Sequence, residues 1–219
     1  MRVSRVASGF KAGVLMCLLC LATAFAAAQS ERPVAINIGG GFSPLTGAVS
    51  SHLTTGWHVT GGVAFNVKNG AFSIGPQFTY NGFGITRSAL REAGTPGGDA
   101  QVWSITADPR LQLPFASKIN PYVVGGVGYY RRTLHFTQPT LINVTFFDPF
   151  FGYVFPGLVG TNQVLKSESR SGPGGSLGAG FTIKLGREGT QFFTEARYHY
   201  AATGSVPTRM IPVTFGLRF

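Results

Sequence analysis

The chain has 219 residues, of which only 12% are charged, whereas 13% are aromatic and 31 are glycine. This composition is too apolar and too aromatic for a disordered protein and favours one all-β domain. The formal net charge is +10, but the basic residues are scattered, whereas nucleic-acid binding needs clustered Lys and Arg, so an anionic lipid surface is the favoured partner rather than nucleic acid.

Residues 1–28 have the pattern of a cleavable signal peptide. Three basic residues, Arg2, Arg5 and Lys11, precede an apolar stretch at 12–24, and small residues follow at 26–28. We therefore expect cleavage before Gln29. The apolar stretch is too short for a transmembrane helix, which needs about 20 residues.

The two cysteines of the chain, Cys17 and Cys20, both fall within this leader. The predicted mature domain, residues 29–219, therefore contains no cysteine, which excludes disulfides, zinc thiolates and a cysteine nucleophile. This part also has no apolar run long enough for a helical span. If it enters a membrane, we expect it to do so as a closed β-barrel, in which every backbone group is paired between strands.

The mature part is a series of eight segments whose polarity alternates from residue to residue, as in transmembrane β-strands. They span residues 34–42, 57–67, 72–81, 103–113, 121–133, 176–185, 192–200 and 211–219. In the fourth segment, for example, Trp103 and Ile105 share one face, and Ser104 and Thr106 share the other. The fifth segment has a glycine-rich centre, and the facing of its side chains is ambiguous.

The two faces of these segments differ in side-chain size. One face is rich in Gly, Ser, Thr and Ala and has few charges, whereas the other carries Phe, Trp, Ile, Leu and Val. A soluble sandwich would bury the large apolar residues and expose the charges. Small residues instead suit the narrow lumen of an eight-stranded barrel, and large apolar residues suit contact with lipid.

The connections between segments alternate between short and long. The short ones are 68–70, 114–120 and 186–189, and the long ones are about 43–55, 83–100, 134–173 and 201–208. Short periplasmic turns and longer extracellular loops are typical of bacterial outer-membrane barrels. We therefore predict an all-β fold, an eight-stranded antiparallel transmembrane β-barrel preceded by a cleavable signal peptide, with both mature termini on the periplasmic side.

The chain resembles the small bacterial outer-membrane β-barrel proteins, the group that includes the OmpA transmembrane domain and OmpX-like barrels. The leader, the eight segments, the strand 121–129 and the ending 213–219 carry this resemblance. It implies a location in the outer membrane, among its lipids. It also implies that the barrel-assembly machinery recognises the C-terminal apolar row of Phe215, Leu217 and Phe219.

Seven polar residues fall on the faces expected to line the lumen: Asp108, Arg110, Lys184, Glu195, Arg197, His199 and Arg218. Buried charges need partners of opposite sign, so we interpret them as a structural network. An acid–base pair of Glu195 and His199 is disfavoured, because four strand residues separate them by about 13 Å.

No metal, cofactor or catalytic site is predicted. The four histidines, His52, His58, His135 and His199, have no ligand spacing. A barrel deacylase of lipid A resembles a serine hydrolase with Ser two residues from His, and His199 lacks such a serine. The nearest similarity, His58 with Thr60, has no nearby carboxylate in the sequence.

The longest connection carries an unusual number of aromatic residues, including Phe146, Phe147, Phe150 and Phe151. The simplest expectation is a loop that folds back over the barrel mouth and buries its own rings. The alternatives are contact with the outer leaflet or a surface for a partner, because exposed loops rarely carry such patches without a role.

The sequence thus favours a non-enzymatic outer-membrane barrel with a structural or surface-interaction role. The alternatives are a narrow channel for small solutes and, less favoured, a lipid-modifying enzyme. An eight-stranded barrel has a lumen that side chains just fill, which argues against a wide pore. No ligand or surface partner can be read from the residues.

Overall fold

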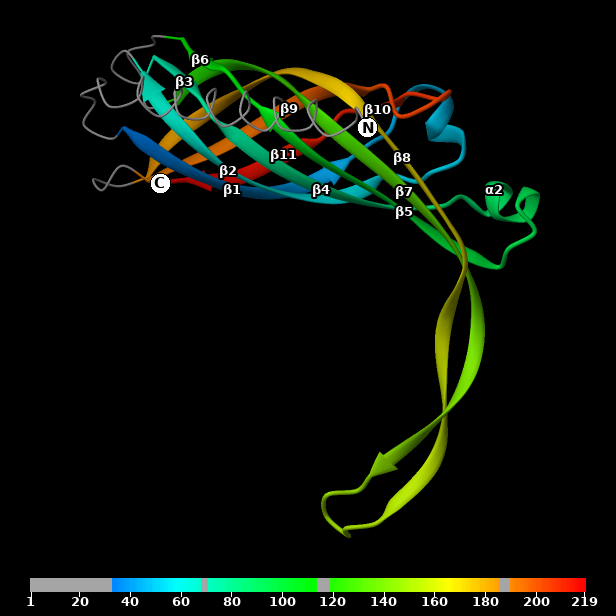
Figure 1. The fold of residues 1–219 in the computed structure, drawn as a ribbon. Coiled ribbons are helices and arrows are strands. Elements are labelled where there is room, and N and C mark those ends of the chain that lie inside the picture. The colour runs from blue at the N-terminus through cyan, green and yellow to red at the C-terminus, as the bar shows by residue number, and fades with distance from the viewer. Residues whose placement is uncertain (1–32, 68–70, 114–118, 186–189) are drawn as a thin grey trace, which may run out of the picture.

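The chain forms a closed antiparallel β-sheet in the computed structural model, which describes residues 33–67, 71–113, 119–185 and 190–219 (Figure 1). The predicted signal peptide and nearly all of the three short turns lie outside the described residues. The sheet closes because β1 pairs with β2 on one side and with β11 on the other. The predicted eight-stranded antiparallel barrel is confirmed.

Three of the eight strands are interrupted and so appear as two segments each. In chain order the strands are β1 (Val34–Ser43), β2 (Gly56–Val67), β3 with β4 (Phe72–Ile74, Pro76–Gly84), β5 with β6 (Gly97–Ala107, Arg110–Gln112), β7 (Ile119–Phe147), β8 (Val154–Leu185), β9 (Thr190–Ala201) and β10 with β11 (Thr208–Met210, Val213–Arg218). Two short helices, η1 (Gly47–Ser51) and α2 (Arg87–Glu92), lie in the long connections. Among the described residues, no helix has the length and apolarity needed to cross a membrane.

A proline, which has no N–H to give to the ladder, lies at each interruption: Pro109 and Pro212 within theirs, and Pro76 directly after the break at Gly75. Backbone hydrogen bonds of neighbouring residues continue the strand pairing across these interruptions. The Asp108 N–H donates to the carbonyl of Gly75 at 2.9 Å, and the N–H groups of residues 125 and 197 donate to the carbonyls of Pro109 and Pro212. Side chains on both sides of a break therefore keep the same facing.

The side chains alternate between the lumen and the outer surface as predicted. The outer face carries large exposed apolar residues such as Ile38, Val59 and Ile105. The structure also settles the facing of the fifth strand, since Tyr122 and Tyr130 of β7 are buried in the lumen. Their rings fit because glycines of β8 lie opposite them; a Cβ added at Gly180, for example, would lie 2.7 Å from the Tyr122 hydroxyl.

The connection at 134–173 is not an irregular loop, because β7 and β8 continue as a paired hairpin to Phe147 and Val154. Pairing of β5 with β7 ends at Thr137, so the remainder is a two-stranded ribbon. Figure 1 shows it leaving the long-loop end of the barrel and bending away from the barrel axis. The expectation that this segment folds back over the mouth is therefore wrong; its β-branched and aromatic residues extend the ladder instead.

Candidate functional site

Four charged side chains from two strands, the interrupted strand β5 with β6 and strand β9, meet in the middle of the lumen. Arg197 of β9 donates from Nε to Glu195 and from a terminal nitrogen to Asp108, which follows β5. Arg110 of β6 donates to Glu195 at 3.5 Å. All four residues are buried. Two guanidinium groups thus balance two carboxylates, as burial of charge requires.

Uncharged side chains complete this lumen cluster. The Tyr122 hydroxyl donates to Glu195 at 2.9 Å, and the Arg110 guanidinium lies 4.4 Å from the centre of the Tyr122 ring. Arg197 also donates to the side-chain amide oxygen of Gln77 at 3.1 Å. Two cavities beside the cluster measure about 10 Å³ each, room for about one water molecule. Side chains therefore fill the lumen at this level.

The other three residues predicted for this network lie outside the cluster. His199 is buried but contacts the Tyr130 hydroxyl at 2.9 Å, and Arg218 donates to the Asn66 side chain at 2.7 Å. Lys184 is exposed near the end of β8, and among the described residues it makes no salt bridge. The prediction that Lys184 belongs to the buried network is therefore wrong. An ammonium group that reaches water needs no buried partner.

A second polar group, which the sequence did not single out, lies closer to the long-loop end. Ser43 contacts His58 at 3.0 Å and donates to Asn81 at 2.8 Å, and the other ring nitrogen of His58 contacts Thr214 at 2.9 Å. The inward positions of His58, Asn81 and Thr214 were predicted, whereas Ser43 fell in the predicted connection 43–55. The contacts of this group join strands that are distant in sequence. Neutral groups that bond one another in this way fix side-chain positions without needing a ligand.

Apolar side chains close the lumen at the long-loop end. The connection that contains η1 supplies Leu45, Val49 and Leu53, and the strands supply Phe83 and Met210. All five are buried in one cluster. The mouth is therefore sealed by the first long connection, not by the aromatic one.

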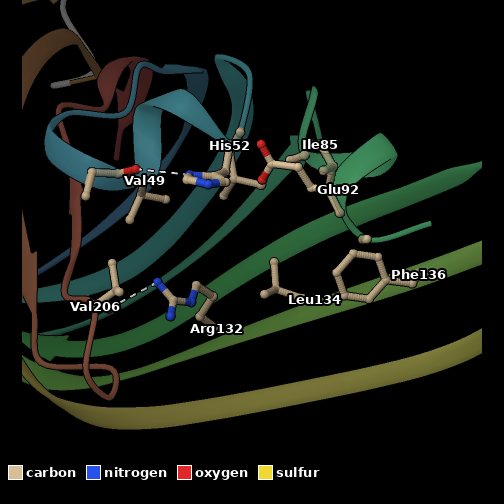
Figure 2. A pocket seen from close by; sticks show the side chains of 12 residues that line it. Val49, His52, Ile85, Glu92, Arg132, Leu134, Phe136 and Val206 are labelled. Carbon is tan, nitrogen blue, oxygen red and sulfur yellow. Dashed lines mark hydrogen bonds between the residues drawn. The ribbon is translucent and has the colours of Figure 1, made fainter. Parts of the chain in front are cut away.

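An apolar pocket of about 470 Å³ lies on the outer side of this seal (Figure 2). The connection with η1, helix α2 and the base of the β7–β8 hairpin form its walls. Figure 2 shows Leu134 and Phe136 along one wall, with Arg132 next to them. The volume is in the range of small-molecule sites, which are apolar with a few polar groups.

The tip of the hairpin is an ordered turn that presents aromatic rings outward. Asp148 holds the turn, because its carboxylate accepts hydrogen bonds from the N–H groups of Phe150 at 2.8 Å and Phe151 at 3.2 Å. Gly152 adopts a φ of 71°, which favours glycine. Phe150 is 92% exposed and Phe151 80% exposed. The tip therefore presents an unpartnered apolar surface to its surroundings.

The rings below the tip support the hairpin. Phe146 and Phe155 stack across the two strands with centroids 5.7 Å apart, and Tyr153 packs on Phe155 at 5.9 Å. Such cross-strand pairs stabilise a two-stranded ribbon, which is marginal by itself. Phe147 is 65% exposed and Phe146 39% exposed. The four phenylalanines singled out in the sequence thus divide into one that supports the hairpin and three that are largely exposed.

The predicted C-terminal row lies on the outer face of the barrel. Phe215, Leu217 and Phe219 are all exposed. The backbone of Phe219 exchanges two hydrogen bonds with Ile36, of 2.9 and 3.1 Å, where the last strand meets the first. The last residue therefore belongs to the seam that closes the ring.

The described residues contain no group of three metal-ligating side chains. Glu195 and His199 have separate partners, as described above, so the structure does not assemble them into an acid–base pair. Two features of the described part of the chain that are open to a partner or ligand are the hairpin tip and the pocket at the mouth.

Comparisons with known proteins agree with this geometry. A family model described as "Outer membrane protein beta-barrel domain" matches residues 13–219. The chain is similar to the solved structure of a major outer membrane protein from Thermus thermophilus, with 11% identity, a TM-score of 0.56 and coverage of 85% of this chain and 97% of that chain. It is also similar to Neisserial surface protein A (NspA), with 11% identity, a TM-score of 0.53 and coverage of 85% and 96%. At these identities the likeness concerns the fold alone. No curated protein sequence matches the chain.

Proposed function

The chain belongs to the family of outer membrane protein β-barrel domains and lies in the outer membrane, and we propose that it acts there as a non-enzymatic surface-interaction protein. The observation that carries this proposal is the β7–β8 hairpin, which extends from the long-loop end and exposes Phe150 and Phe151 at its tip. Large exposed apolar groups on a protein surface mark sites of contact.

The charge pattern of the hairpin supports the same function. Between residues 136 and 165 the only charged side chain is that of Asp148, and its carboxylate is occupied in the turn. The outward end therefore offers apolar contact without competing charges. We propose that outer-membrane lipids surround the barrel and that the hairpin reaches past them to an apolar surface on a neighbouring cell or substratum.

Replacing Phe150 and Phe151 with serine should reduce adhesion of cells that produce the protein, because it removes the most exposed apolar area at the tip. Adhesion to octyl-coated beads, measured relative to cells without the protein, should fall several-fold. A Leu141→Ser/Leu158→Ser variant is the matched control, since both leucines are highly exposed on the same hairpin but lie away from the tip.

Equal surface amounts of each variant are verified first by protease accessibility. The proposal fails if the tip variant adheres as strongly as the wild type, or if the wild-type protein adds no adhesion over cells that lack it. A loss of equal size in the control would indicate general hydrophobicity of the hairpin and would also contradict a role for the tip.

The channel alternative makes a different prediction. Because the lumen cluster and the apolar seal both block the barrel axis, the purified protein should give no discrete conductance steps in planar bilayers. A general porin reconstituted in the same bilayer serves as the positive control. Regular steps from this protein would favour the narrow channel over the proposed function.

A further inference from the structure

The pocket at the mouth is a closed-ended apolar site. Val49 and Leu53 belong both to its lining and to the seal beneath it, so the pocket does not continue into the lumen. Ile85 and Ala89 line the α2 side, and Phe136 lines the hairpin side. A ligand that enters from outside would be retained there, not passed through the barrel.

The polar groups of the pocket are few and lie on different sides. His52 and Glu92 come from the η1 and α2 side, whereas Arg132 comes from β7 (Figure 2). The His52 ring is held by the Ala48 carbonyl and the Ser51 hydroxyl. Because the rest of the lining is apolar, a ligand that fills this space needs a mainly apolar body.

Arg132 is a half-buried cation that has no carboxylate of its own. Its terminal nitrogens donate to neutral oxygens, the carbonyls of Val206 at 3.3 Å and Thr203 at 3.4 Å and the hydroxyl of Thr208 at 3.2 Å. Among the described residues it forms no salt bridge. The nearby Glu168 is bound by Arg170 at 2.9 and 3.1 Å. A partly desolvated charge of this kind favours an anionic partner.

We propose that this pocket binds an anionic single-chain amphiphile of the medium-chain fatty-acid class. The carboxylate binds the free N–H groups of Arg132, and the alkyl chain lies along Leu134, Phe136 and Ile85. The volume of about 470 Å³ suits a small ligand of this type more than a two-chain lipid. This inference goes beyond the proposed function and does not depend on the aromatic tip.

The test is equilibrium binding to the purified barrel in nanodiscs. Dansyl-labelled undecanoate is the fluorescent probe, dodecanoate and dodecanol are the competitors, and empty nanodiscs measure simple partition into lipid. Dodecanoate should displace the probe in a saturable manner, and dodecanol should be about tenfold weaker, because it lacks the charge that pairs with Arg132.

Two variants separate the charge from the cavity. Arg132→Gln should weaken dodecanoate about tenfold and remove its advantage over dodecanol. Ala89→Trp should abolish binding of both, since the indole occupies the pocket from α2 and leaves Arg132 in place. Arg131→Gln, on the same strand but exposed on the opposite face, is the control and should bind as the wild type does.

The proposal is overturned if protein-containing nanodiscs bind no more probe than empty ones, or if dodecanol competes as well as dodecanoate. Unchanged binding in Ala89→Trp would place the amphiphile elsewhere and would also overturn it. Because Arg132 anchors residues 203–208, the fold of each variant is verified by heat-modifiable gel migration. Failure of this binding test leaves the adhesion test of the hairpin unaffected.

Discussion

Replacing Arg197 with methionine should lower the free energy of unfolding of the barrel by about 3–5 kcal/mol, the cost of removing one partner from a buried ion pair. The variant leaves the carboxylates of Asp108 and Glu195 with only Arg110 to balance them. The decrease in the free energy of unfolding is measured by urea unfolding in phospholipid vesicles, with heat-modifiable gel migration as the readout of folded protein.

A second substitution tests whether the lost charge balance causes the destabilisation. Adding Asp108→Asn to Arg197→Met removes one charge of each sign and leaves the Arg110–Glu195 pair intact. The double variant should therefore recover much of the lost stability. Lys184→Met is the control and should change little, because the lysine is exposed. A double variant no more stable than the single one would show that packing, not charge balance, makes Arg197 important.

The same cluster shows what sequence patterns could and could not predict. The alternation at 103–113 correctly predicted that Asp108 and Arg110 face the lumen, because a period of two fixes the face on which each strand residue lies. The alternation could not predict which charged residues pair with each other, since Arg197 and Asp108 are 89 positions apart and meet across the lumen. Lys184 has the correct facing but lies so near a strand end that it reaches water.

The long connections were less predictable than the strands. Residues 134–173 are rich in β-branched and aromatic residues but do not alternate regularly in polarity, and only pairing between the two halves decides between a ribbon and a loop. The seal formed by Leu45, Val49 and Leu53 depends on contacts with strands far along the chain. Period-two patterns describe how a segment presents its faces, but not what covers the end of the barrel.

Deleting Phe219 should reduce the amount of protein in the outer membrane several-fold, while refolding into detergent micelles in vitro changes little. The reason is the prediction, drawn from the family resemblance, that the barrel-assembly machinery recognises the terminal aromatic residue together with Phe215 and Leu217. The deletion also removes two seam hydrogen bonds to Ile36, each of which contributes only about 0.5–1.5 kcal/mol. A loss this small should not by itself prevent the isolated chain from folding.

Side-chain substitutions distinguish recognition from seam pairing. Phe219→Ala keeps the backbone bonds to Ile36 but loses the ring, so a recognition role predicts low outer-membrane levels, and Phe219→Tyr should restore them. A pairing role predicts normal levels for both. Ile36→Ala is the matched control, because it trims the exposed partner across the same seam without touching the C-terminus. Normal levels of the deleted protein would refute the assembly role, since the machinery would then insert a chain without its terminal ring.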